Sequence, residues 1–253
     1  MDSLLNSVYS MRNSTVSPVK PVFDYKAAQQ QTKALIDGYK ENTARVQTLK
    51  AESAAFLDEY TKGMNAMNAA AGALTGGGAD KLLYGAGGEV TEDTVKATVD
   101  AVQKMADQYN ENLKMLNDNA GRGAGVVKQI ARMADDPAAE SAMKMVGMAV
   151  NKDGTLALDT AKMTETLKTA DANQRSLLAD LIGGTSGIAA GVQRDARAGL
   201  NTSAGSLIGN DVARLQEIQQ EDPIRQFAQS MRGYGAYGMN NMAAVGVLMN
   251  LTA

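Results

Sequence analysis

A regular spacing of apolar residues through residues 24–74 constrains the fold more than any other feature of the chain. Side chains recur at alternating steps of four and three, which places them on one face of an α-helix. A helix of roughly 45 residues would span about 65–70 Å and needs a partner along its length. The partner is either a later segment or another subunit. The seam consists of Leu35, Tyr39, Asn42, Val46, Leu49, Ser53, Phe56, Tyr60, Gly63 and Met67, with polar or small interruptions at Asn42, Ser53 and Gly63.

A second seam follows a predicted helix start at Thr91, where Glu92 and Asp93 suit the positive end of the helix dipole. The composition also favours helices packed along seams, because aromatic residues make up 4% of the chain and 15 methionines supply much of its apolar content. This second seam consists of Val95, Val99, Val102, Ala106, Tyr109, Leu113 and Leu116.

One stretch in the second half predicts β-structure. Short apolar runs at 146–150 and 156–158 flank Asp153-Gly154, a dipeptide typical of tight turns, so the sequence predicts a hairpin near 146–158. Asp159 then caps a helix that carries Met163 and Leu167 on one face. The predicted fold class is mainly α, with long heptad-bearing helices in an elongated bundle and one small β-hairpin.

Four regions follow from these patterns. Residues 1–23 are predicted to be a mobile N-terminal segment, 24–125 a coiled-coil-like helical rod, 126–232 a helical region with the hairpin, and 233–253 a hinge with an apolar assembly segment. Thr75 to Gly78 should end the first long helix, and residues 79–90 should form a loop. Asp136-Pro137 and Asp222-Pro223 each predict a helix start, the first for a helix running to Met145. Residues 187–221 should be helical, although Gly191, Gly199, Gly205 and Gly209 weaken the prediction.

The residue types present exclude several kinds of chemistry. The chain has no cysteine and no histidine, which removes disulfides, the usual zinc sites and an imidazole general base. The glycine clusters lack the flanking residues of phosphate-binding loops. A calcium loop with Gly154 at its sixth position would begin at Ala149 and end at Thr160, neither of which is a carboxylate. We therefore expect no enzymatic activity, no cofactor and no metal.

Charge and hydropathy limit the partners. A net charge of −3 gives no electrostatic reason to expect nucleic acid or an anionic membrane. The longest apolar run, 242–249, is far shorter than the ~20 residues that a membrane span needs. The N-terminus carries no basic leader or long apolar run, so no cleavable secretory signal is expected.

The hairpin-to-helix stretch resembles the C-terminal region of the flagellar cap family, the filament-capping hook-associated protein 2. Lys152, Asp153, Gly154, Asp159 and Lys162 match a Lys-Asp-Gly-Thr-Leu-x-Leu-Asp-x-x-Lys pattern, and the likeness covers about forty residues. The resemblance implies a flagellar axial type of structural protein, whose terminal helices assemble after export through the flagellum. Caps of this family are longer and carry β-rich outer domains that this chain lacks.

Together these features predict a secreted structural protein that self-assembles into an extracellular flagellum-like filament, or into a cap-like assembly on the flagellum or cell surface. Its partners would be copies of itself, with other flagellar axial proteins or an export chaperone. The alternative is an intracellular helical adaptor or chaperone-like module that holds a partner helix along residues 35–67. The predicted assembly contacts are Leu4, Leu5, Val8, Leu35, Tyr39, Val46, Leu49, Phe56, Tyr60, Val245, Leu248 and Met249.

Overall fold

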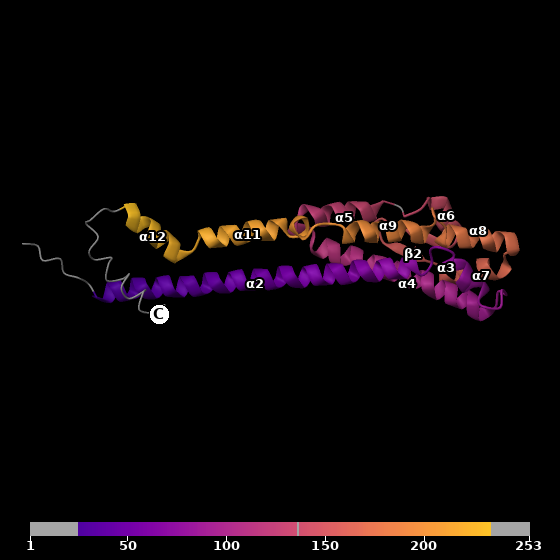
Figure 1. Cartoon of the computed structure of the whole chain (residues 1–253), viewed down its shortest axis with the longest axis horizontal. Helices are drawn as coiled ribbons and strands as arrows, with labels where there is room; N and C mark the ends of the chain where they lie inside the picture. The colour runs from indigo at the N-terminus through magenta and orange to yellow at the C-terminus, as the bar shows by residue number, and fades with distance from the viewer. Residues whose placement is uncertain (1–24, 136, 234–253) are drawn as a thin grey trace, which may run out of the picture. The chain divides into compact units, whose positions relative to one another are not determined.

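The computed structural model describes residues 25–135 and 137–233, and they are mainly α-helical with one small β-hairpin, as predicted (Figure 1). The first helices are α2 (Tyr25–Gly72), α3 (Gly78–Tyr84) and α4 (Glu92–Asp118), followed by the short 3₁₀ helix η1 (Ala120–Arg122), α5 (Ala124–Ala134) and α6 (Glu140–Met145). After the strands β1 (Met148–Val150) and β2 (Leu156–Leu158) come α7 (Thr160–Thr169), α8 (Ala172–Gly183), α9 (Ile188–Leu200), α10 (Ala204–Leu207), α11 (Gly209–Gln220) and α12 (Pro223–Gly233).

The chain divides into two compact units. The terminal unit comprises residues 1–44 and 220–253, of which 25–44 and 220–233 are described, and the central unit comprises residues 45–219. The central unit includes residues on both sides of the predicted boundary at 125. Residues 1–23 and 234–253, predicted to be a mobile segment and a hinge with an assembly segment, lie outside the described residues.

The central unit has one continuous apolar core. Helix α3 packs against α4 and α8, α4 packs against α5 and α7, and α9 packs against α5 and α8. All seven residues of the second predicted seam are buried on α4, and the predicted cap at Thr91 forms a reciprocal pair of hydrogen bonds with Thr94. Methionine fills much of the remaining volume, since Met64, Met67, Met105, Met133, Met143, Met148 and Met163 are each at most 1% exposed.

The hairpin has the predicted position and turn. Strands β1 and β2 pair antiparallel, with Met148 opposite Leu158 and Val150 opposite Leu156. Gly154 adopts a φ of 82°, a left-handed conformation that favours glycine. On its outer edge β2 is tied to α4, because the backbone N–H and C=O of Leu156 both bond the side-chain amide of Asn110, at 2.7 and 2.8 Å.

The predicted turn and cap residues hold this geometry. The Asp153 carboxylate accepts hydrogen bonds from the hydroxyl of Thr155 at 2.6 Å and from its N–H at 3.0 Å, which lowers the pKa of Asp153. Asp159 accepts from the N–H of Lys162 at 2.9 Å and caps α7. Lys152 is exposed in the turn. Asp153, Gly154 and Asp159 therefore fix the turn and the start of α7.

Three predicted segments differ from the structure. Residues 79–90 are not all loop, because α3 occupies Gly78–Tyr84 and buries Leu83. The helix expected from Pro137 begins only at Glu140, and the Pro137 carbonyl instead packs closely against α9, where a Cβ at Gly191 would lie 2.0 Å from its oxygen. The segment 187–221 forms three helices, α9, α10 and α11, instead of one. Helix α10 has its own N-cap, because the Ser203 hydroxyl accepts from the N–H of Ser206.

Candidate assembly surface and interhelical cleft

The predicted assembly residues fall into three groups. Leu35, Val46 and Leu49 are half-buried on α2, and Tyr39 is 45% exposed. Phe56 and Tyr60 are only 3% and 2% exposed. The remaining six, namely Leu4, Leu5, Val8, Val245, Leu248 and Met249, lie outside the described residues.

Phe56 and Tyr60 belong to the core of the central unit, so the structure gives these two side chains an internal role. The Tyr60 hydroxyl donates to the carbonyl of Gly199 at 3.0 Å, and burial raises the pKa of this phenol. The guanidinium of Arg122 lies over the Phe56 ring, 5.2 Å from its centroid. The chain itself therefore covers this part of the first seam.

The described part of the terminal unit buries its apolar side chains less completely than the central unit does. Its described apolar side chains Leu35, Ile36, Ile224 and Phe227 are half-buried, and Tyr39 is exposed. We call these five side chains the terminal apolar set. Among the described residues of this unit, those that are fully buried are the polar Thr32 and Asn42.

The two described helical segments of the terminal unit approach each other closely at a glycine. A Cβ on Gly38 of α2 would lie 2.9 Å from Cγ of Pro223, the first residue of α12. Helix α12 begins at Pro223, as the Asp222-Pro223 pair predicted. The Asp222 carboxylate accepts a hydrogen bond from the N–H of Ile224 at 2.9 Å. This packing brings the two segments together but leaves the terminal apolar set partly in contact with water.

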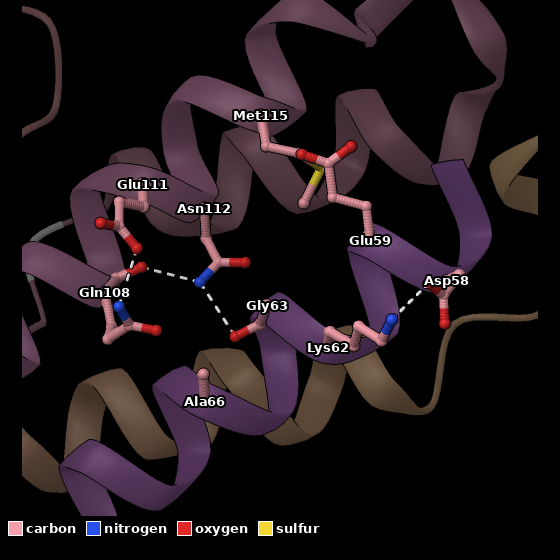
Figure 2. Close-up of a pocket in the computed structure, with 9 residues that line it drawn as sticks. All are labelled: Asp58, Glu59, Lys62, Gly63, Ala66, Gln108, Glu111, Asn112 and Met115. Atoms are coloured by element: carbon pink, nitrogen blue, oxygen red, sulfur yellow. Dashed lines mark hydrogen bonds and ion pairs between the residues drawn. The ribbon is translucent and has the colours of Figure 1, made fainter. Parts of the chain in front are cut away.

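A cleft of about 440 Å³ lies between α2 and α4 in the central unit (Figure 2). Its acidic side chains Asp58, Glu59 and Glu111 outnumber its single base, Lys62, which pairs with Asp58 at 2.7 Å. Three carboxylates and one ammonium give the lining a formal charge of −2. Gly63, Ala66, Gln108, Asn112 and Met115 complete the cleft.

The side-chain amide of Asn112 has a fixed orientation in this cleft. Its Nδ2 donates to the carbonyls of Gly63 at 3.0 Å and Gln108 at 2.7 Å. If the amide were flipped, its oxygen would face these two carbonyl oxygens and neither hydrogen bond could form. Oδ1 is buried without a hydrogen-bond partner, and in Figure 2 it points into the opening toward the side where Glu59 lies. An orphaned buried acceptor of this kind costs about 1–3 kcal/mol.

A second polar contact of α2 is fully paired. Asp211 of α11 is 2% exposed, and its Oδ2 accepts from the Ser53 hydroxyl at 2.9 Å and from Nη1 of Arg122 at 2.7 Å. Arg122 also donates from Nε to Oδ1 of Asn119 at 2.6 Å. Ser53 and Gly63, which interrupt the predicted seam, thus each face a polar partner within the central unit.

Sequence analysis did not find these polar partners. Asn112 stands among the apolar residues Tyr109, Leu113 and Leu116, and a polar residue inside this apolar stretch is the signal that could have identified it. Asp211 carried no such signal, because its partner Ser53 lies 158 residues away along the chain.

The described residues provide neither a metal site nor a membrane-spanning helix. They contain no group of three or more acidic, histidine or cysteine side chains that could hold a metal ion. None of the helices in this part of the chain is long and apolar enough to cross a membrane. No family model, curated protein or solved structure matches this chain.

Proposed function

We propose that the chain is a non-enzymatic structural protein that self-assembles through its terminal unit. The observation that carries the proposal is the difference between the two units: the central unit buries an extensive apolar core, whereas the terminal apolar set stays half-buried or exposed. Side chains of this kind are covered when a second copy packs against them.

The size of this surface indicates the type of assembly. Fully burying a side chain such as Leu, Ile or Phe contributes about 1.5–3 kcal/mol, so burying the remaining half of five such side chains contributes roughly 4–8 kcal/mol. Association costs an estimated 4–15 kcal/mol in lost translational and rotational freedom. A single pairwise contact is therefore weak, and a stable assembly requires each subunit to contact several neighbours. A filament provides that arrangement.

The proposed setting is an extracellular flagellum-like filament or a cap-like assembly on the flagellum. Its support is the resemblance of Lys152, Asp153, Gly154 and Asp159, with Lys162, to the flagellar cap pattern. The hairpin and the capped helix give this pattern a defined conformation. The adaptor alternative retains only part of its binding seam, because the chain itself covers Phe56, Tyr60 and Met67.

Electron microscopy of the purified full-length chain, combined with fractionation of the cells that produce it, tests this function. We expect ordered filaments in vitro and the protein in the cell-surface fraction. Deleting residues 240–253 should abolish filaments while leaving helicity by circular dichroism nearly unchanged. Monodisperse particles together with confinement to the cytosol would instead favour the adaptor, and filaments that survive the deletion would show that these terminal contacts are wrongly assigned.

A further inference from the structure

We propose that the cleft between α2 and α4 binds the guanidinium group of an arginine side chain. The proposal goes beyond self-assembly and rests on different residues, all in the central unit. It begins from two independent observations: the excess of acidic side chains in the lining, and the orphaned Oδ1 of Asn112, which points into the opening (Figure 2).

The unused hydrogen-bonding groups of the cleft are mainly acceptors, because its three carboxylates face a single ammonium. Asn112 Nδ2 is already used twice, Lys62 is paired with Asp58, and the amide nitrogen of Gln108 donates to Glu111 at 2.7 Å. The acceptors with most unused capacity are Asn112 Oδ1, which has no partner, and the carboxylate of Glu59, with which no basic side chain in the described part of the chain pairs. A ligand that complements them must be a positively charged donor of several N–H groups.

A guanidinium group fits this set better than an ammonium or a metal ion. It is planar, carries five N–H donors in a fixed arrangement and is more weakly hydrated than an ammonium, so it loses less on entering a partly apolar site. Met115 and Ala66 offer apolar contact to its stem. No described cluster of ligating side chains provides the three groups that a metal site would need.

Access to Asn112 Oδ1 requires a local side-chain movement. This oxygen is buried close to the Gly63 backbone in the free protein, so an N–H of the ligand would reach it only after side chains of the lining, such as Glu59 and Met115, shift. Glu59 is exposed and Met115 is unbranched, which makes both movements inexpensive. Binding then gives the orphaned acceptor its donor and places the positive charge beside Glu59.

Nuclear magnetic resonance of the isotope-labelled full-length chain tests the site, with N-acetylarginine amide as the probe. Its neutral isostere N-acetylcitrulline amide is the matched ligand control. We expect saturable shifts of the Asn112 side-chain N–H signals with the arginine probe and at least tenfold weaker binding of the citrulline probe. Equal responses to the two probes, or no response at Asn112, would overturn the proposal.

Two variants on the same face of α2 locate the charge contact. Glu59→Gln should weaken binding of the arginine probe at least threefold, whereas Glu52→Gln, one heptad earlier and also exposed, should leave it unchanged. Equal effects of both variants would mean general electrostatic attraction and would refute the site. When probe binding is established, an Asn112 shift that grows with protein concentration in the absence of the probe identifies a second copy as the arginine source. No such shift identifies a separate arginine-bearing ligand.

Discussion

Gly63 allows α2 and α4 to approach each other, and replacing it with alanine tests the geometry of this contact. The added Cβ would lie 2.2 Å from Oδ1 and 3.1 Å from Cγ of Asn112. In an open helix the same substitution stabilises by about 1 kcal/mol. Here the Asn112 amide must retreat and give up its hydrogen bonds to the carbonyls of Gly63 and Gln108.

The expected size follows from these terms. Each lost hydrogen bond costs about 1 kcal/mol, and each buried polar group left without a partner costs a further 1–3 kcal/mol. After subtracting the gain in helix propensity of about 1 kcal/mol, two lost hydrogen bonds and one orphaned group lead us to expect that Gly63→Ala lowers the free energy of unfolding by at least about 2 kcal/mol. That corresponds to a melting temperature roughly 4–8 °C lower for a chain of this size.

Thermal and urea unfolding followed by circular dichroism measure this effect. Gly205→Ala is the control, because a Cβ at Gly205 of α10 meets no other atom within 4 Å. The double variant Gly63→Ala/Asn112→Ala removes the collision and should recover part of the loss. If Gly63→Ala stabilised the chain as much as the control does, the close approach of α2 and α4 would be refuted.

Two further predictions concern charged groups. Asp211→Ala should lower the free energy of unfolding by about 3 kcal/mol in urea titrations, because it breaks the largely buried contact with Arg122. The control Asp58→Ala breaks the exposed pair with Lys62 and should change the free energy of unfolding by under ~1 kcal/mol. Equal losses in the two variants would contradict this account. Burial raises the pKa of Asp195 to about 6 from 3.8, so the folded state binds this proton more tightly and stability falls as pH rises from 4 to 6. Asp195→Asn should therefore stabilise the chain above pH 7 by about 1 kcal/mol after allowance for solvent screening, and the gain should vanish near pH 4; a gain independent of pH would exclude the carboxylate as its cause.

Local patterns in the sequence predicted those elements whose determinants lie close together along the chain. The α4 seam, the cap at Thr91, the Gly154 turn and the cap at Asp159 each depend on residues within a few positions of one another. Propensity and periodicity record such interactions directly. All four were confirmed.

Contacts between distant segments account for what the sequence did not predict. Gly63 meets Asn112 across 49 residues and Ser53 meets Asp211 across 158, so the spacing within α2 marked these positions as interruptions without naming their partners. Helix α3 was not predicted because it begins in a glycine-rich stretch whose local sequence favours a loop. Burial of Leu83 in the core stabilises this helix. The apolar spacing of the first seam likewise could not show which of its residues the rest of the chain buries, such as Phe56 and Tyr60, and which remain exposed, such as Tyr39.

Sedimentation velocity over a series of protein concentrations tests self-assembly through the terminal unit most directly. Tyr39→Glu places a charge in the terminal apolar set, where burial against a second copy would be costly. Ala44→Glu adds the same charge on the exposed opposite side of α2. We predict concentration-dependent assembly of the unmodified chain and of Ala44→Glu, and at least tenfold weaker assembly of Tyr39→Glu. A chain that stays monomeric at every concentration, or equal assembly of all three proteins, would contradict this account.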